Sequence, residues 1–289
     1  MRSKHVVWKS VGILLLASFF LLFSVYQWGS YSYSDQVAVL AYHHLSEKEQ
    51  SSVTITPQLF REQLSYLKRK GYHFITLDQF KQYIEGAPVP KKAVLITFDD
   101  GYESFYTYGY PVLQELRIPA VNFVITKDLD HPKATHLPSL SREEIREMKR
   151  QSDLVDFQCH SHGLHAKANG KPLLTSYLLA DGKQETQDEY RARIVNDTQK
   201  CINGLYELHN KKVDTYAYPF GMYHKEASEL VQQGGIGYAF TVTSRMATRK
   251  DDPLQLPRIN AGNPSITPKK LHKTIIRRAI KCKLSTVQT

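Results

Sequence analysis

A continuous apolar segment, Ala93 to Phe98, runs directly into two adjacent carboxylates, Asp99 and Asp100. An unbroken run of apolar and β-branched residues is typical of a strand buried on both faces, as in a parallel sheet covered by helices. In barrels and open α/β folds, catalytic groups gather at the carboxyl end of such strands, and paired carboxylates suit metal binding together with proton abstraction. The alternative is an ordinary polar turn after the strand. The segment therefore predicts a parallel α/β fold with a candidate site at the two aspartates.

A histidine cluster follows a second apolar segment. Val155 to Cys159 is another predicted strand, and it leads into His160, His162 and His165. Imidazole nitrogens and one aspartate from the other strand end can form a mixed nitrogen and oxygen site for a divalent ion, with one position open for water. An aspartate pair and a histidine cluster at two similar strand ends are improbable as a joint accident. We therefore predict a metal site.

Predicted strands and helices alternate along the chain, which favours a βα architecture. Thr56 before Pro57, and Ser141 with Glu144, have the composition of helix N-terminal caps. The predicted strands are residues 37–42, 73–76, 93–98, 121–125, 155–159, 215–218 and 238–242. The predicted helices are residues 57–70, 77–85, 141–149 and 188–208. Residues 163–183 contain glycine and proline without a steady period, and they are expected to form a long loop at the active end.

The first residues are typical of an export signal. Arg2, Lys4 and Lys9 precede an apolar run, and polar and small residues follow it. The run is shorter than the ~20 residues that a membrane-spanning helix needs, which favours cleavage over anchoring. An uncleaved anchor stays open, because no Ala-x-Ala site is present. We expect a signal peptide over residues 1–28 and one domain over residues 29–289, with a catalytic core of about 37–280.

The three cysteines are an odd number, so no disulfide framework is expected, and Cys159 is predicted to be a buried, inert thiol.

The formal net charge is +10, and basic residues are dense in the last twenty-one positions. Such a segment can bind anionic cell-envelope polymers, or it can be the solvated face of a helix. Nucleic acid is not an expected partner, because no phosphate-binding glycine loop or zinc-finger spacing is present.

The motifs together resemble a known family. Thr97 to Gly101, followed by His160-Ser161 and later by Tyr218 to Gly221, is similar to the polysaccharide deacetylases of the NodB-homology type, carbohydrate esterase family 4. Tyr42 to His44, the step from His160 to His165, and Leu256 to Ile259 are most similar to the deacetylases of poly-β-1,6-N-acetyl-D-glucosamine. The resemblance implies a distorted, incomplete (β/α) barrel and a secreted enzyme associated with the cell wall or cell surface.

The resemblance also implies roles for individual residues. Asp99 corresponds to the family's general base, and the metal ligands correspond to Asp100, His160 and His165, with His162 as the alternative to His165. The residues expected to bind substrate or the oxyanion are Tyr218, Pro219, Phe220 and His43. One divalent ion is expected: zinc, with nickel, cobalt or iron as alternatives.

Two positions depart from the family pattern. Ala217 stands where many members carry an arginine that orients the catalytic aspartate, and Arg258 is a candidate replacement by analogy only. The late Leu-x-His motif, which supplies the acid for the leaving amine, is poorly matched by Leu271 and His272. His43 and His44 are therefore open alternatives for the acid.

The expected function is metal-dependent N-deacetylation of poly-β-1,6-N-acetyl-D-glucosamine, the biofilm exopolysaccharide, at the cell surface by a monomeric enzyme. A peptidoglycan or chitin-oligomer deacetylase is the alternative within the same chemistry. A catalytically weak polysaccharide-binding protein is the alternative from another class, because such a protein would need neither the missing arginine at Ala217 nor the late histidine motif.

Overall fold

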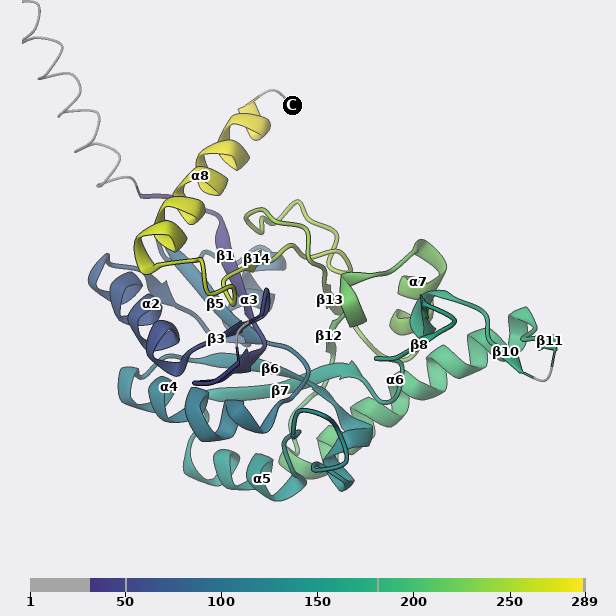
Figure 1. Cartoon of the computed structure of the whole chain (residues 1–289). Helices are drawn as coiled ribbons and strands as arrows, with labels where there is room; N and C mark the ends of the chain where they lie inside the picture. The colour runs from purple at the N-terminus through teal and green to yellow at the C-terminus, as the bar shows by residue number, and fades with distance from the viewer. Residues whose placement is uncertain (1–31, 50, 181, 288–289) are drawn as a thin grey trace, which may run out of the picture. The chain divides into compact units, whose positions relative to one another are not determined.

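Parallel strands form the frame of this protein, for which a computed structural model describes residues 32–49, 51–180 and 182–287 (Figure 1). Among those residues, one sheet has the order β13-β12-β7-β6-β5-β1-β14, and β4 pairs with the start of β5. Every pairing in this sheet is parallel. Its strands are β1 (Val37–Tyr42), β4 (His73–Phe74), β5 (Ala93–Phe98), β6 (Ala120–Ile125), β7 (Val155–Ser161), β12 (Thr215–Ala217), β13 (Tyr238–Phe240) and β14 (Ile259–Asn260).

The sheet curls until its two edges nearly meet. Phe240 of β13 forms a parallel bridge with Leu256, and the chain then enters β14, which pairs with β1 on the opposite edge. The segment around Leu256 therefore spans the gap between the edges with a single bridge in place of a full strand. The result is the predicted distorted, incomplete (β/α) barrel.

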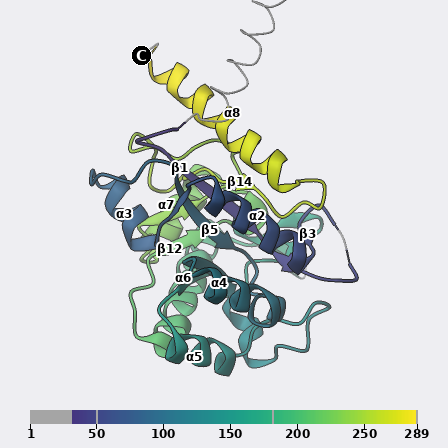
Figure 2. The same ribbon diagram turned by 90° about the vertical axis from the view of Figure 1, so that its left-hand side faces the viewer.

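Helices cover the outside of the curled sheet (Figures 1 and 2). They are α2 (Pro57–Arg69), α3 (Leu77–Ile84), α4 (Tyr110–Leu116), α5 (Arg142–Gln151), α6 (Gln187–His209), α7 (Lys225–Gln233) and α8 (Pro268–Val287). Thr56 and Ser141 cap α2 and α5 through their side chains, as the sequence predicts. Each cap satisfies backbone N–H groups that the first helical turn leaves unpaired.

Alternation along β5 decides which side chains point into the barrel. Leu95 lies in one core cluster with Val39 and Phe123, whereas Phe98 packs its ring against Phe60 of α2 on the other face. Because side chains of a strand alternate between faces, Thr97 and Asp99 share the inner face with Leu95. Asp99 therefore lies inside the barrel at its carboxyl edge.

Short elements at the carboxyl edge were not predicted. Residues 163–180 and 182–185 contain two small antiparallel strand pairs around a short 3-10 turn, η3 (Leu173–Thr175), instead of an irregular loop. The pairs join β8 (Lys167–Ala168) with β9 (Lys171–Pro172), and β10 (Leu179–Ala180) with β11 (Lys183–Gln184). Other short elements are β2 (His44–Leu45), β3 (Thr54–Ile55), η1 (Phe105–Gly109), η2 (Thr126–Asp130) and η4 (Pro219–Gly221). Two-residue strands carry too few residues for a periodic pattern, which is why the sequence did not reveal them.

The prediction for Cys159 is wrong. Cys159 of β7 forms a disulfide with Cys201 of α6, and Cys282 is not part of a disulfide. An odd number of cysteines excludes complete pairing but not one bridge, and two half-cystines 42 residues apart carry no local signal.

The predicted signal peptide lies outside the described residues. Within residues 32–287, positions 50 and 181 apart, no helix has both the length and the apolar character needed to cross a bilayer.

Candidate active site

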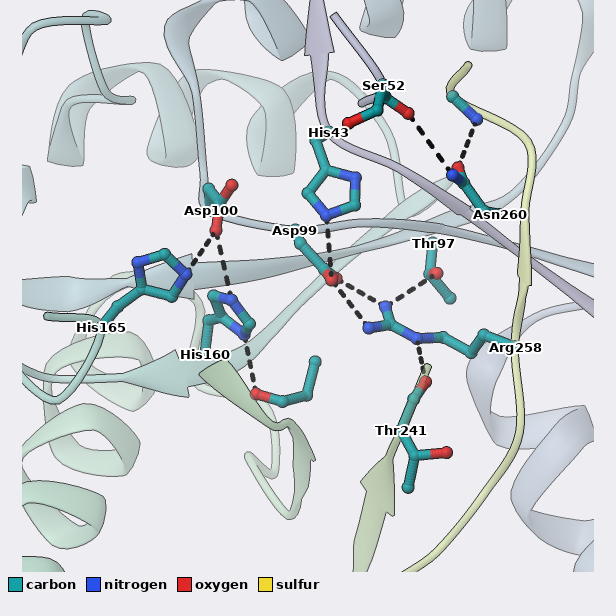
Figure 3. Close-up of polar contacts among 12 residues, drawn as sticks. His43, Ser52, Thr97, Asp99, Asp100, His160, His165, Thr241, Arg258 and Asn260 are labelled. Carbon is teal, nitrogen blue, oxygen red and sulfur yellow. Dashed lines mark hydrogen bonds and ion pairs between the residues drawn. The ribbon is translucent and has the colours of Figure 1, made fainter. Parts of the chain in front are cut away.

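A buried ion pair lies at the centre of the site. Both terminal nitrogens of Arg258 donate to the Asp99 carboxylate, at 2.6 and 2.7 Å, and the Arg258 Nε donates to the Thr241 carbonyl at 3.1 Å (Figure 3). Only 3% of Asp99 and 2% of Arg258 is exposed. Burial raises the pKa of Asp99, but the guanidinium outweighs it and holds that pKa below its ordinary value. Asp99 is therefore an ionised carboxylate at neutral pH, and Arg258 supplies the charge that Ala217 lacks.

Three predicted metal ligands converge beside this pair. Asp100 Oδ1 lies 3.2 Å from His160 Nε2 and 3.3 Å from His165 Nε2, and one ligand atom from each residue lies within 4.8 Å of the others. Asp100 Oδ1 is buried and accepts no hydrogen bond from the described part of the chain. A buried carboxylate oxygen without a donor is costly unless a cation compensates it. Two nitrogens and one oxygen around a common point therefore fit a divalent ion.

The orientation of His160 supports the same conclusion. Its Nδ1 lies 2.7 Å from the Ala217 carbonyl, which can only accept, so Nδ1 carries the proton and Nε2 of the neutral ring presents a lone pair. In the neutral ring that lone pair faces the oxygen of Asp100, an arrangement that either a metal ion between them or a proton on Nε2 stabilises. A ligand histidine usually donates its other ring N–H to a backbone carbonyl in this way.

The two histidines differ in their protonation. Burial lowers the pKa of His160, but Asp100 and Asp99 outweigh burial and raise it above its ordinary value. Burial, together with the neighbouring His160, lowers the pKa of His165 to about 4. His165 is therefore neutral at pH 7, and a proton would compete with a metal ion mainly at His160.

The loop that carries His165 is held by a residue that the sequence reasoning missed. Asp197 of α6 accepts the backbone N–H groups of His162 and Gly163, at 2.8 and 2.6 Å, and is 9% exposed. His162 is thereby turned toward Thr126, whose Oγ1 lies 3.0 Å from the His162 Nδ1, and it is not part of the ligand group. A signal was present, because Asp197 interrupts the apolar face of a predicted helix.

The strand itself also aims His160. The register between β6 and β7 shifts after Val124, which pairs with Cys159, whereas Ile125 pairs with Ser161. His160 is therefore the extra residue of a bulge, and bulges re-aim side chains beside active sites. The disulfide at Cys159 links this point to α6.

A cavity of about 540 Å³ opens onto Asp99 and the three candidate metal ligands. His43 lines it, and its Nε2 lies 3.7 Å from Asp99 Oδ2. The other two candidate acids lie elsewhere: His44 contacts the Ser104 hydroxyl, and His272 of α8 contacts the Tyr72 hydroxyl. Of the three candidates for the acid, His43 is therefore the one that faces the reaction centre.

The segment from Tyr218 to Gly221 forms one wall of this cavity. Phe220 has a φ of 60°, and its ring lies 4.3 Å from the His165 ring, centre to centre. Gly221 has a φ of 66°, and a Cβ there would come within 2.4 Å of Val242, so this position requires glycine. Pro219 is buried at the start of the turn. The segment is therefore rigid, as expected of a backbone donor.

Tyr218 lines the same cavity, but its hydroxyl does not face it. That hydroxyl contacts the Ser228 hydroxyl and donates to the Leu254 carbonyl, and the side chain is fully buried. Tyr218 therefore supports the loop, and any contact with substrate would come from its backbone or ring face.

A second cavity, of about 330 Å³, shares Asp100 and His165 with the first and extends toward Tyr102, Asp128 and His136. Two of the three candidate metal ligands, Asp100 and His165, therefore border both cavities.

Comparison with known proteins agrees with the geometry. The polysaccharide deacetylase family model matches residues 86–239. A poly-beta-1,6-N-acetyl-D-glucosamine N-deacetylase of Staphylococcus epidermidis is 31% identical over 216 residues, which are 75% of this chain and 71% of the relative. Its counterpart from Staphylococcus aureus strain MSSA476 is 28% identical over 218 residues, 75% of this chain and 71% of the relative.

Solved structures show the same fold. IcaB from Ammonifex degensii is 28% identical with a TM-score of 0.71, covering 83% of this chain and 97% of that one. A de-N-acetylase from Aggregatibacter actinomycetemcomitans is 25% identical with a TM-score of 0.73, covering 83% and 100%. The predicted resemblance and the barrel are thereby confirmed. This chain belongs to the polysaccharide deacetylase family, carbohydrate esterase family 4, whose members are hydrolases that act on N-acetyl amides.

Proposed function

We propose that this protein is a metal-dependent N-deacetylase of poly-β-1,6-N-acetyl-D-glucosamine at the cell surface. The observation that carries the proposal is the convergence of Asp100, His160 and His165 beside an ionised Asp99. The substrate is proposed from the relatives, because those at about 30% identity are named for this polymer.

The ion would be held by Asp100 Oδ1, His160 Nε2 and His165 Nε2. When bound, it would polarise the acetamide carbonyl and lower the pKa of a water molecule. Zinc fits two imidazoles and one carboxylate, and nickel, cobalt and iron accept the same ligands.

The chain's own groups then move protons and stabilise charge. Asp99, held in place by Arg258, accepts the proton of the attacking water. The backbone N–H of Phe220 donates to the oxyanion, in a loop that Gly221 and Pro219 keep rigid. His43 donates a proton to the leaving amine, because its ring lines the cavity next to Asp99. The products are acetate and a glucosamine unit with a free amine.

Two observations support the proposed location. A disulfide such as Cys159–Cys201 is typical of proteins in oxidising compartments, and an exported protein would be in such a compartment. Helix α8 buries Leu271, Ile275 and Ala279, and it exposes basic residues such as Lys269 and Lys273. This basic face would hold a monomeric enzyme to anionic envelope polymers, an attraction that salt screens over about 8 Å.

The location can be tested by washing cells with concentrated salt. A cleaved protein should leave the surface, and replacing exposed lysines of α8 with glutamine should weaken retention without exposing its apolar face. A protein that resists salt and requires detergent would instead be anchored by its leader.

The activity is tested by measuring acetate release from poly-β-1,6-N-acetyl-D-glucosamine, chitin oligomers and peptidoglycan, with and without a chelator. We expect release from the first substrate, loss with chelator and recovery with zinc. Preference for chitin or peptidoglycan would refute the substrate, and polymer binding without release would indicate a binding protein. Arg258 and His43 argue against the binding protein, because both lie beside Asp99 and can take the roles that Ala217 and His272 do not.

A further inference from the structure

A separate cavity lies within residues 163–180 and 182–185, which we call the arm. Its volume is about 460 Å³, and it is lined by polar and apolar side chains that include Asn169, Thr175, Ser176, Tyr177, Leu179 and Gln184. None of its lining residues lines the catalytic cavity. A cavity of this size with a few polar groups is typical of small-molecule sites.

The arm is held in one shape by α6. Arg193 donates to the carbonyls of Leu173 and Ser176, both at 2.9 Å, and makes two hydrogen bonds to the Glu185 carboxylate at 2.7 and 2.8 Å. The Tyr190 hydroxyl donates to the Leu174 carbonyl at 2.8 Å. The walls of the arm cavity are therefore built before any ligand arrives, which lowers the entropic cost of binding.

Tyr177 gives this cavity an aromatic surface. Its ring stacks on the buried ring of Tyr190, with centres 4.8 Å apart and an angle of 28° between the planes. Tyr177 nevertheless stays 40% exposed and lines the cavity. Because one face of the Tyr177 ring is already packed, the ring loses little conformational entropy when a ligand contacts its open, apolar face. Amide and hydroxyl side chains lie beside it. This combination suits a sugar ring, which has apolar C–H faces and a rim of hydroxyl groups.

The arm cavity adjoins the catalytic site through one hairpin. The Lys167 ammonium of β8 lies 4.8 Å from the centre of the Phe220 ring, and that ring packs on the ligand His165. The next residue, Ala168, lines the arm cavity, as does its partner in β9, Lys171. Two consecutive residues of β8 therefore serve the two sites: Lys167 contacts a ring that lines the catalytic cavity, and Ala168 lines the arm cavity. Figure 1 shows β8 between α7 and the β10–β11 end of the arm.

We infer that the arm cavity is a second glycan subsite, which binds a sugar unit of the same chain several units away from the one being deacetylated. Tyr177 stacks on this unit, and Asn169 and Gln184 hydrogen-bond its hydroxyl or acetamide groups. The inference rests on the proposed function, since the ligand is the polymer whose acetyl groups are removed. The subsite makes the enzyme prefer long chains to short ones.

The test is kinetic and uses the full chain with its metal. Acetate release is measured on a β-1,6-linked N-acetylglucosamine disaccharide and on progressively longer oligomers for the parent, Tyr177→Ala and Tyr177→Phe. Loss of one stacking contact should raise KM for long oligomers roughly two- to tenfold in Tyr177→Ala, with kcat unchanged. KM for the disaccharide should not change, and Tyr177→Phe should match the parent.

Tyr206→Ala is the matched control, because Tyr206 of α6 is 51% exposed and lines neither cavity. Its length dependence should equal that of the parent. Equal effects of Tyr177→Ala on short and long substrates, or no effect on either, would overturn the subsite. A parent that releases no acetate at any length would refute the proposed function instead, so the two failures are distinguishable.

Discussion

Replacing Arg258 with methionine tests how the carboxylate of Asp99, the proposed general base, is kept ionised. The substitution removes both hydrogen bonds to Asp99 and leaves a carboxylate that is 3% exposed without its guanidinium. Burial, which raises the pKa of Asp99, then acts without the charge that opposes it. Truncating one partner of a buried ion pair costs about 3–5 kcal/mol. We therefore expect a large loss of stability at neutral pH and a protonated Asp99 over much of the acid range.

The sign of the pH dependence follows from the lowered pKa. In the parent, the ionised Asp99 contributes stability above the ordinary carboxyl pKa of about 3.9, and this contribution is lost as the pH falls through the lowered pKa of the folded state. In Arg258→Met that pKa is raised, so the acid limb of kcat/KM should move to higher pH. Activity near pH 7 should fall by roughly a hundredfold or more, with partial recovery at alkaline pH.

The assay is kcat/KM across about pH 5 to about pH 9, together with metal content and free energy of unfolding. Arg258→Lys is the matched variant: it keeps the charge but loses the two-point contact, and it should lie between parent and methionine variant. Metal content should stay unchanged in both. A pH profile of Arg258→Met that superimposes on the parent profile would refute the reasoning, as would loss of the metal.

Four further outcomes are expected. Asp99→Asn should keep the metal and lose almost all acetate release; near-parental turnover would show that another group is the base. His165→Ala should weaken metal binding by orders of magnitude, whereas His162→Ala should leave metal content nearly unchanged; a larger effect of His162→Ala would exclude His165 as the second histidine ligand. Cys201→Ser should lower the free energy of unfolding by about 4 kcal/mol in denaturant titration, from the 42-residue separation of the bridged cysteines; equal stability would contradict this. In the metal-free protein the raised pKa of His160 means that its protonated form contributes stability at low pH, which is lost as the pH rises through that pKa. The increase in unfolding temperature that zinc causes should therefore grow with pH. An increase that does not change with pH would count against His160 as a ligand.

Local patterns in the sequence predicted much of the scaffold. The apolar run before Asp99 identified a buried parallel strand, and the capping residues Thr56 and Ser141 located helix starts, because each of these signals lies within a few neighbouring residues. The sequence also indicated the type of site, because the carboxylates and imidazoles that follow two strands are the side chains of a mixed nitrogen and oxygen metal site. The general form of the site therefore followed from the sequence alone.

Only the tertiary structure decided which distant residues complete that site. Arg258 reaches Asp99 across 159 positions because the sheet curls and its last segment returns beside β1. Cys159 meets Cys201 because α6 packs on β7. The choice of His165 over His162 depends on Asp197, which is 35 residues from His162 and holds the loop in one register. These contacts have no periodicity along the chain, since their geometry is set by how the layers pack and not by the spacing of the residues.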